Sequence, residues 1–395
     1  AGGTSMNILM LGWEFPPYKT GGLGTACYGL TKGMSKEGVD ITFVVPFDPG
    51  KGEFVKLKGM TSSKVKCVPS LLAPYQTTSA YDICKSMAGA KEVYGQNLFA
   101  EVDRYSQLAA GYADDSYDLI HAHDWMTYQA GILAKEQTGK PLIVHIHATE
   151  YDRTGGNPNP EIAQREAAGM HAADWVIANS QRLKDEVIKH YAIDPAKIEV
   201  VHWGIDTDEK PAHQPAGWTE PTVLFLGRMT IQKGPEYFVQ AASKVLEQDP
   251  DVRFVMVGSG DKLPEIINLA AELGIADKIM FTGALTGEDV NKAFSMADLF
   301  VMPSVSEPFG LVALEAMHNG TPAIISNQSG VAEVMHHCMK TDFWDVDRMA
   351  NLILSSLQHN VVLDEIKTNG KQEIKRFGLQ EPAKKVINVY KKVLS

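Results

Sequence analysis

Short apolar runs alternate with amphipathic stretches along the whole chain, and this alternation constrains the fold more than any other feature. The first series of apolar runs covers residues 8–11, 41–45, 119–122, 142–146, 175–178 and 198–201, and the second covers residues 223–226, 254–257, 279–281, 299–302 and 323–325. Strands that alternate with helices form stacked βα units around parallel sheets. The sequence therefore predicts an α/β protein with two doubly wound domains.

The stretch between the two series sets the expected domain boundaries. Residues 204–221 are rich in proline and show little periodicity, so we interpret them as a linker. An N-terminal domain is then expected over residues 6–203, a C-terminal domain over residues 222–376, and a final helix within residues 377–395. Ligands of open α/β sheets bind beyond the carboxyl ends of the strands, so both domains should turn those ends toward a central cleft.

Two other parts of the chain have weaker signals. Within residues 50–116, the pattern of apolar residues predicts a strand near residues 64–68 and a helix around residues 92–113. Residues 1–5 have neither a basic start nor a long apolar stretch, and we interpret them as an expression scar.

Composition and charge narrow the class of protein. Hydrophobic residues make up 44% of the chain and charged residues 22%, which is ordinary for a globular protein. The formal net charge of -11 argues against nucleic acid and anionic membrane surfaces as partners. The four cysteines Cys27, Cys67, Cys84 and Cys338 form no CxxC pair, so we expect reduced and mostly packed thiols. We therefore expect a cytoplasmic protein without stable membrane association.

Two glutamates follow the strand predicted over residues 299–302. Glu307 lies on the loop after that strand, and Gly310 opens a helical run in which Glu315 lies about 7.5 Å along the axis. A helix N-terminus offers unpaired N–H groups and partial positive charge, which favour an anion. A ligand with hydroxyl groups at both ends and negative charge in the middle suits this layout, and nucleotide-sugars have that form. The alternative is that both glutamates are solvated surface side chains.

A second loop, after the strand predicted over residues 223–226, carries Arg228 and Lys233. Pro235 suits the first turn of the helix that follows. An arginine can bind two phosphate oxygens at once, and a lysine supplies a compact charge. The two cations are therefore candidates for binding a diphosphate, against the alternative that they are solvated surface charges.

A glycine-rich turn follows the first predicted strand and leads into a helix. Gly21 and Gly22 let backbone N–H groups approach a phosphate closely, and Lys19 adds a positive charge. The turn matches neither the Walker loop nor the GxGxxG pattern. The alternative, a turn that needs glycines only for its shape, stays open.

Histidines gather at the ends of two strands of the first series. His121 and His123 belong to one strand, and His145 and His147 belong to the next. His147 precedes a loop and is the candidate site residue, whereas His121 and His145 are expected to pack in the core. A zinc site is conceivable with a third ligand, but neither an HExxH nor a CxxC motif accompanies these histidines.

These motifs resemble those of a known family. The matching residues are Lys19-Thr20-Gly21-Gly22-Leu23, His121-Ala122-His123-Asp124-Trp125, Arg228 with Lys233, and Glu307 with Glu315. In this order they resemble the retaining GT-B glycosyltransferases, within these the glycogen/starch synthase-like group, and most closely its short archaeal-like members grouped with family 4. The resemblance covers nearly the whole chain. It implies the GT-B fold, in which two Rossmann-like domains face a central cleft and the final helix crosses back to the N-terminal domain.

The resemblance also implies roles at the donor for some of these residues and their neighbours. The donor sugar would be held by Glu307 and by the amides of Phe309, Gly310 and Leu311, and the ribose hydroxyls by Glu315. The diphosphate would be bound by Arg228 and Lys233 together with Lys19 and the amides of Gly21 and Gly22. His147 would contact the transferred sugar near the reacting carbon. For the acceptor, Tyr151 and Trp125 are candidates because aromatic rings can stack on sugar rings.

The implied reaction is a retaining transfer of glucose from UDP- or ADP-glucose to the non-reducing end of an α-1,4-glucan. It needs neither a metal nor a cofactor, and the Asp206-x-Asp208 and Asp345-x-Asp347 pairs are not interpreted as metal-binding motifs. Thr25 and Trp203 depart from the family pattern, where an Asp and an Asn are usual. These departures leave the acceptor and the nucleotide base open.

Three other functions compete with this interpretation. The same fold could transfer to a sugar phosphate or another small acceptor, as in sucrose-phosphate synthase-like enzymes. A non-catalytic glucan- or nucleotide-sugar-binding protein is disfavoured by the presence of Glu307, Arg228 and Lys233. A Rossmann oxidoreductase is disfavoured because the GxGxxG pattern is missing.

Overall fold

The structure is a computed structural model that describes residues 5–12, 14, 22–47, 54–55, 63–72, 78–87, 95–211 and 218–395. Lys19 and Gly21, two residues of the predicted donor site, lie outside these ranges. Contacts between residues divide the chain into two compact units. Unit 1 comprises Ala1–Thr149, Asn159–Trp203 and Leu379–Ser395, and unit 2 comprises Glu150–Pro158 and Gly204–Gly378.

Unit 1 is built on an eight-stranded sheet with the order β3-β4-β2-β1-β5-β6-β7-β8. Its strands are β1 (Asn7–Leu11), β2 (Asp40–Phe47), β3 (Phe54–Val55), β4 (Ser63–Pro69), β5 (Leu119–His123), β6 (Leu142–Ile146), β7 (Trp175–Ala178) and β8 (Ile198–Val200). Neighbouring strands are parallel, except that β3 is antiparallel to β4. β1, β5 and β6 are buried almost throughout, as expected of parallel strands covered on both faces.

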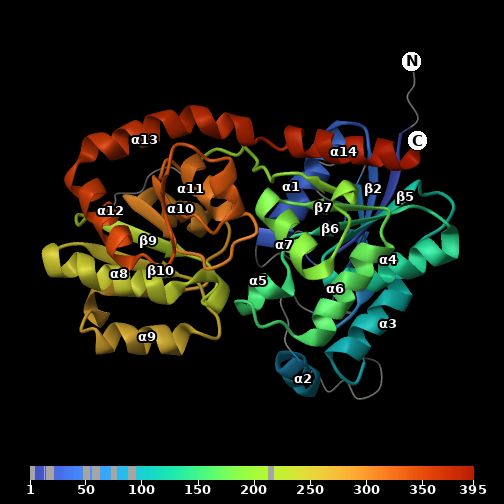
Figure 1. The fold of residues 1–395 in the computed structure, drawn as a ribbon, viewed down its shortest axis with the longest axis horizontal. Coiled ribbons are helices and arrows are strands. Elements are labelled where there is room, and N and C mark those ends of the chain that lie inside the picture. The colour runs from blue at the N-terminus through green and yellow to red at the C-terminus, as the bar shows by residue number, and fades with distance from the viewer. Residues whose placement is uncertain are drawn as a thin grey trace. The chain divides into compact units, whose positions relative to one another are not determined.

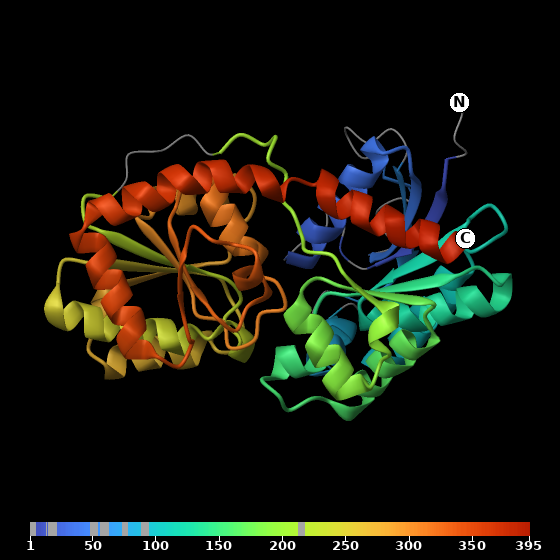
Figure 2. The ribbon, with the colours of Figure 1, turned by 45° about the horizontal axis from the view of Figure 1, so that its top comes forward.

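Helices cover both faces of this sheet (Figures 1 and 2). They are α1 (Gly22–Lys36), α3 (Leu98–Ala110), α4 (Trp125–Thr138), α6 (Pro160–Ala172), α7 (Gln181–Tyr191) and α14 (Gln380–Leu394). A further helix of this unit, α2 (Thr78–Met87), contacts α3. α1 packs against α14, and α4 packs against α3 and α6. The last helix of the chain therefore belongs to the same unit as its first strand.

Unit 2 has a six-stranded sheet with the order β11-β10-β9-β12-β13-β14, in which all neighbours are parallel. Its strands are β9 (Thr222–Leu226), β10 (Arg253–Val257), β11 (Ile279–Gly283), β12 (Leu299–Met302), β13 (Ala323–Ser326) and β14 (Met339–Thr341). Its helices are α5 (Glu150–Thr154), α8 (Pro235–Gln248), α9 (Leu263–Glu272), α10 (Glu288–Met296), α11 (Leu311–His318), α12 (Val346–Gln358) and α13 (Asn360–Glu373).

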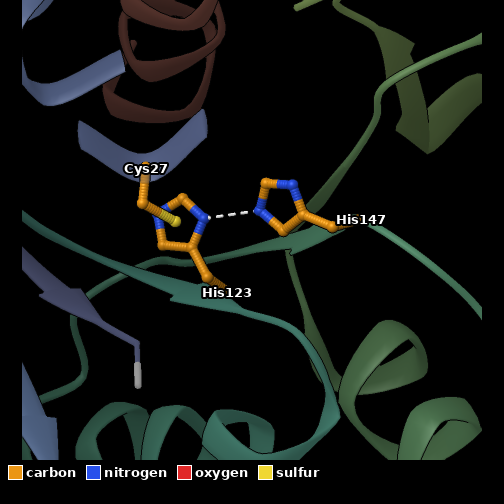
Figure 3. Close-up of side chains that lie close together, drawn as sticks. All are labelled: Cys27, His123 and His147. Carbon is orange, nitrogen blue, oxygen red and sulfur yellow. Dashed lines mark hydrogen bonds between the residues drawn. The ribbon is translucent and has the colours of Figure 1, made fainter. Parts of the chain in front are cut away.

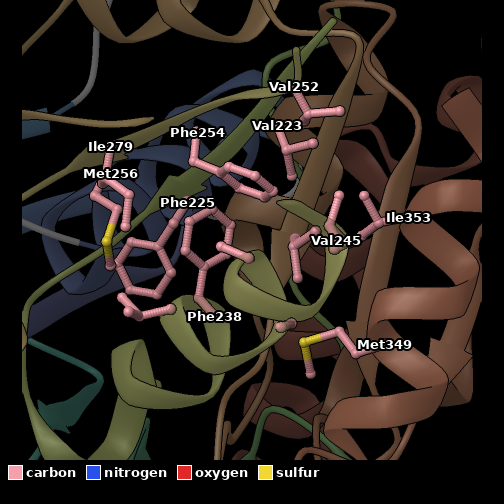
Figure 4. Close-up of a cluster of buried hydrophobic side chains, with 14 of the residues drawn as sticks. Val223, Phe225, Phe238, Val245, Val252, Phe254, Met256, Ile279, Met349 and Ile353 are labelled. Atoms are coloured by element: carbon pink, nitrogen blue, oxygen red, sulfur yellow. The ribbon is translucent and has the colours of Figure 1, made fainter. Parts of the chain in front are cut away.

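The core of unit 2 lies between the sheet and the helices α8 and α12 (Figure 4). Phe238 of α8 packs against Phe225 and Phe254 of two neighbouring strands, with ring centroids 5.6 and 5.7 Å apart. Met349 and Ile353 of α12 complete this cluster and are fully buried. This packing holds α8 against the sheet, and the N-terminus of α8 lies two residues after Lys233.

The structure confirms the predicted fold class, because each unit is a doubly wound α/β sheet. The strand expected near residues 64–68 is β4. The helix expected around residues 92–113 is shorter, because the Asn97 side chain caps its start by accepting from the Ala100 N–H at 2.9 Å. The helix α2 and the strands β3 and β14 were not predicted. Both strands are two or three residues long, which is too short for a periodic signal.

The thiols and helix lengths bear on two further expectations. Cys27, Cys67, Cys84 and Cys338 are all free. Cys27 and Cys67 are buried, Cys338 is half-buried and Cys84 is exposed, so packing of the thiols is only partial. Among the described residues, no helix combines the length and the apolar character that crossing a bilayer requires.

Candidate active site

The candidate site in unit 2 starts where the strand order of the sheet reverses. β9 and β12 are neighbours although β10 and β11 lie between them in the chain, and Leu299 pairs with Val223. The loops after these two strands carry Lys233 and Glu307. Ligands of open α/β sheets bind at such reversal points, because the helices that follow leave toward opposite faces. The topology therefore brings two residues that are 74 positions apart to one edge of the sheet.

Lys233 and Glu307 form an ion pair at this edge. The Lys233 Nζ lies 2.5 Å from the Glu307 Oε2, and the Ser304 hydroxyl donates to the same oxygen at 3.3 Å. Glu307 is only 6% exposed. A carboxylate this buried needs a counter-charge and hydrogen-bond donors, and these two side chains supply them.

Close backbone contact between the two loops holds this pair in place. Gly234 has a φ of 62°, and a Cβ on it would lie 2.3 Å from the carbonyl oxygen of Pro303. The N–H of Val305 donates to the carbonyl of Gln232 at 2.9 Å. Only a glycine allows both this left-handed turn and this approach, so the position of Lys233 depends on its neighbour. Pro235 then opens α8, as predicted.

The Glu307 loop is also fixed on its other side. The N–H of Glu307 donates to the carbonyl of Gln328 at 3.0 Å, and its carbonyl accepts from the N–H of Gly330 at 2.9 Å. Gly310, with a φ of 105°, turns the chain into α11. Phe309 and Leu311 are 0% and 4% exposed, so both residues are buried in unit 2. The carbonyl of Phe309 accepts from the N–H of Val331 at 2.7 Å.

Arg228 belongs to the loop that carries Lys233, and Glu315 belongs to the helix that follows the Glu307 loop. Arg228 follows β9, is half-buried, and its Nη2 lies 3.5 Å from the Gln232 Oε1. Glu315 is half-buried on α11, the helix that Gly310 opens. Of these four predicted residues, Lys233 and Glu307 meet at one sheet edge, and their direct pairing was not predicted.

One segment from the first half of the sequence joins these loops. The Ser306 hydroxyl donates to the Asp152 Oδ1 at 2.6 Å across 154 positions of sequence. Asp152 lies on α5 and is 3% exposed. On the same helix, Arg153 forms an ion pair with Glu150 at 2.9 Å. Tyr151, a predicted acceptor residue, is half-buried on the same short helix. No local pattern in the sequence marks Asp152 as a partner of Ser306.

The histidines of unit 1 form a stack at the ends of β5 and β6. His123 pairs with His145 in the register of the two strands. The rings of His121 and His123 stack at 4.3 Å, as do those of His145 and His147. The four residues are 0–5% exposed. The expectation that His121 and His145 pack in the core is confirmed, and His147 is buried within unit 1 as well.

Hydrogen bonds link these rings in pairs. The His123 Nδ1 lies 2.9 Å from the His147 Nε2, and the His121 Nε2 lies 3.2 Å from the His145 Nδ1. The hydroxyl of Tyr390, on α14, lies 2.6 Å from the His121 Nδ1. Burial lowers the pKa of all four histidines, that of His123 to about 3. The rings are therefore neutral near pH 7.

The backbone of His147 is held from both sides. Its N–H donates to the Asp124 Oδ1 at 2.7 Å, and its carbonyl accepts from the Asn179 Nδ2 at 3.0 Å. Asp124 has a φ of 61°, which is unusual for a residue other than glycine. The ring of Trp203, which replaces the family's usual asparagine, lies 5.1 Å from that of His147. Asp124 and Asn179 were not predicted, although an Asp directly after a buried strand is a usable signal.

Two further predicted residues lie in unit 1. Gly22 opens α1, where the buried carboxylate of Glu14 accepts from the N–H of Gly24 at 2.6 Å. One N–H group at this helix end therefore already donates to a carboxylate of the protein itself, as expected at a helix N-terminus, where negative charge is favoured. Trp125 opens α4, is 6% exposed, and its ring lies 6.2 Å from that of Phe99. Asp345, one of the paired aspartates, caps α12 by accepting from the N–H of Arg348 at 3.0 Å.

Comparison with known proteins identifies the chain's relatives. A glycosyltransferase of Methanocaldococcus jannaschii, described as uncharacterised, is 30% identical over 98% of this chain and 98% of its own length. A D-inositol 3-phosphate glycosyltransferase of Streptomyces scabiei is 33% identical, over 69% of this chain and 66% of that protein. The second match thus spans about two thirds of the relative's length.

Solved structures share the fold at lower identity. Sucrose-phosphate synthase from Thermosynechococcus elongatus superposes with a TM-score of 0.80 at 21% identity, covering 98% of this chain and 99% of that one. The catalytic domain of starch synthase IV from Arabidopsis thaliana, bound to ADP and acarbose, superposes with a TM-score of 0.72 at 16% identity, covering 99% and 100%.

Family models match both halves of the chain. The model described as glycosyltransferase family 4 matches residues 20–209, and the model described as glycosyl transferases group 1 matches residues 206–373. Together with the full-length relative and the two parallel sheets, these matches show that the chain belongs to the family 4 glycosyltransferases of the GT-B fold.

Proposed function

We propose that the protein transfers glucose from UDP- or ADP-glucose to the non-reducing end of an α-1,4-glucan, with retention of the anomeric configuration. The observation that carries this proposal is the Lys233–Glu307 pair at the strand reversal of unit 2. It joins a cation suited to a phosphate and a carboxylate suited to sugar hydroxyls at one sheet edge.

The donor would bind by exchanging this ion pair. Lys233 would turn from Glu307 to the diphosphate and leave the carboxylate oxygens to accept from hydroxyls of the sugar. Arg228 follows β9 on the same loop, and the N-terminus of α11 adds partial positive charge. Fixed positive charge stabilises the negative charge that develops on a leaving diphosphate, and such charge stabilisation is a large part of catalysis. The ADP bound to the starch synthase of the same fold supports a nucleoside diphosphate donor.

His147 would orient the transferred sugar through a neutral ring. Its backbone is held by Asp124 and Asn179, so the ring has a defined position in unit 1. Because burial lowers its pKa, the ring would act as a hydrogen-bonding group and not as a second cation. The acceptor proton would pass to the donor phosphate on the same face of the sugar.

A second candidate is transfer to a small phosphorylated acceptor. The curated relative at 33% identity acts, by its name, on D-inositol 3-phosphate, and the sucrose-phosphate synthase has the highest TM-score quoted above. The indole of Trp125 is 6% exposed in unit 1, which leaves little ring face for a glucan to stack on. This candidate retains the donor site and changes only the acceptor.

A panel of donors and acceptors tests both proposals. UDP-, ADP- and GDP-glucose are each incubated with glycogen, fructose 6-phosphate or D-inositol 3-phosphate, and the product anomer is determined by NMR. The first proposal expects an α-linked product with glycogen. Product with the phosphorylated acceptors alone would establish the second candidate. A β-linked product would contradict retention, and no turnover of any of the three donors would overturn both proposals.

A further inference from the structure

Three possible metal ligands from separate elements meet in unit 1 (Figure 3). Cys27 comes from α1, His123 ends β5, and His147 follows β6. One ligand atom from each residue lies within 4.8 Å of the other two. All three residues are buried, with exposures of 0–5%. The glycosyl transfer proposed above gives no role to Cys27 or to His123.

The spacing is close to that of a tetrahedral metal centre. Zinc bonds of about 2.0–2.1 Å to nitrogen and about 2.3 Å to sulfur place two nitrogens about 3.3 Å apart and a nitrogen and sulfur about 3.6 Å apart. The His123 Nδ1 and the His147 Nε2 already face each other at 2.9 Å. A cation between them would need these nitrogens to separate by only a few tenths of an ångström. The sulfur, which lies within 4.8 Å of one nitrogen of each ring, would have to approach by up to about 1.2 Å.

Among the described residues, the rings of His123 and His147 make no hydrogen bond other than the one that joins them. The His123 Nε2 and the His147 Nδ1 are buried and have no hydrogen-bond partner among the described residues. When the two facing nitrogens bind a cation, these outer nitrogens can carry the imidazole protons.

A second group of three histidines is less suited to a cation. It comprises His121, His123 and His145. Both ring nitrogens of His121 already have partners, namely the Tyr390 hydroxyl and the His145 Nδ1. A metal there would have to break one of these hydrogen bonds, whereas at Cys27 it breaks only the contact between two imidazoles.

We propose that Cys27, His123 and His147 form a site for a divalent transition-metal cation of the zinc type, with one coordination position left open. One sulfur and two imidazoles suit zinc and cobalt better than magnesium or calcium, which prefer oxygen. The Cys27 thiol loses its proton on binding. If His147 contacts the donor sugar as proposed above, the cation competes with the donor and the site inhibits the enzyme.

Cobalt spectroscopy tests the site without any activity measurement. The chain is dialysed against EDTA and titrated with Co²⁺. We expect a single equivalent to produce the visible bands of tetrahedral Co²⁺ and a near-ultraviolet thiolate charge-transfer band. Cys27→Ser should abolish the charge-transfer band and weaken binding by at least about 100-fold, since even outer-shell changes weaken metal binding by about 10–100-fold. Cys84→Ser, which removes an exposed thiol, is the matched control and should leave both unchanged.

Several results would overturn the proposal. They are the absence of tetrahedral bands in the unmodified chain, a charge-transfer band that persists in Cys27→Ser, and a band that disappears in Cys84→Ser. X-ray absorption of the zinc-loaded unmodified chain needs no variant, so it keeps the test valid if Cys27→Ser fails to fold. It should show one sulfur and two imidazole nitrogens, and a shell of oxygen or nitrogen alone contradicts the site.

Inhibition is measured separately once the donor is known. Zn²⁺ should raise the KM for the donor in the unmodified enzyme, and Cys27→Ser should need at least about 100-fold more Zn²⁺ for the same effect. Equal inhibition of both enzymes would contradict competition at this site. An inactive enzyme that still gives the cobalt spectrum would disprove the proposed reaction and leave the metal site intact.

Discussion

The loop site of unit 2 and the histidine stack of unit 1 are built in opposite ways. Lys233 and Glu307 carry full charges, lie on loops, and meet because two glycine-dependent turns place them together. The histidines of unit 1 are neutral, lie at the ends of two strands, and meet because β5 and β6 are in register. Charge on a loop can be changed one side chain at a time, whereas a buried stack responds as a unit.

The largest effect is expected from removal of the Lys233 charge. Lys233→Ala should lower kcat by at least about 10²-fold, or roughly 2.7 kcal/mol, because the leaving diphosphate loses a fixed counter-charge. Steady-state kinetics with saturating donor measures it.

The matched control for this variant is Lys244→Ala, on the following helix α8. Lys244 pairs with Asp347 at 2.6 Å, but both side chains are exposed, so its loss should change kcat by less than about twofold. A kcat near normal in Lys233→Ala would contradict the assigned role.

As the pH is lowered, unit 1 should lose stability at a higher pH than unit 2. The folded-state pKa values of the four stacked histidines are lowered, so their stabilising effect is complete above about 6.5, the unfolded-state value, and is lost as the pH falls toward their folded values. Between roughly pH 7.5 and pH 5.5 each histidine should remove about 1.4 kcal/mol of unfolding free energy.

Unit 2 should lose its corresponding contribution at lower pH. Burial alone would raise the pKa of Glu373, but N–H donors from His337 and His336 and the His337 ring lower it overall. Its contribution is therefore present above the ordinary carboxyl value and lost below it. Hydrogen exchange in EDTA, followed for β5 and β6 against β9 and β12, should show earlier loss of protection in unit 1. Simultaneous loss in both units would contradict the prediction.

A pair of glycine variants separates shape from charge. Gly234→Ala should destabilise unit 2 by at least about 2 kcal/mol, because the added methyl group meets the Pro303 carbonyl and the φ of 62° is strained for alanine. Gly22→Ala, at the start of α1, should cost no stability, since nothing lies within 4 Å of the added Cβ. Denaturant unfolding of both variants measures this, and equal losses would refute the argument from the turn.

The smallest effect is expected where α14 contacts the histidine stack. Tyr390→Phe removes the hydroxyl 2.6 Å from the His121 Nδ1 and leaves a buried ring nitrogen without that partner. The expected loss of unfolding free energy is about 1–2 kcal/mol, with kcat little changed. Tyr237→Phe is the control, since none of the hydrogen bonds described involves its hydroxyl. An unchanged stability of Tyr390→Phe would show that this hydrogen bond contributes nothing net.

Features with a short sequence period could be predicted, and features set by long-range contact could not. The apolar runs predicted the long strands. Arg228, Lys233 and Glu307 became candidates because they follow two of these runs, and ligands of open α/β sheets bind beyond the carboxyl ends of the strands. The partnership of Asp152 with Ser306 depends on contact across 154 positions, and that of Tyr390 with His121 on contact across 269. Neither pair has a local pattern.

The same limit applies to the histidines. The sequence placed His145 and His147 on one strand, whereas β6 ends at Ile146 and His147 is the residue after it. The approach of His123 to His147 depends on which strands are neighbours and on their register, and neither follows from one strand alone. Cys27 joins them only because α1 packs on the same sheet, so a third possible ligand could not be found by spacing.

The place of α14 has a consequence for synthesis of the chain. Unit 1 includes Leu379–Ser395, and Tyr390 reaches its histidine stack, yet all of Gly204–Gly378 is translated in between. On the ribosome the first unit to emerge is thus the last to be completed. The surface of unit 1 that α14 covers therefore stays exposed until the end of synthesis, while unit 2 can already fold. Such transiently exposed surface is what chaperones bind.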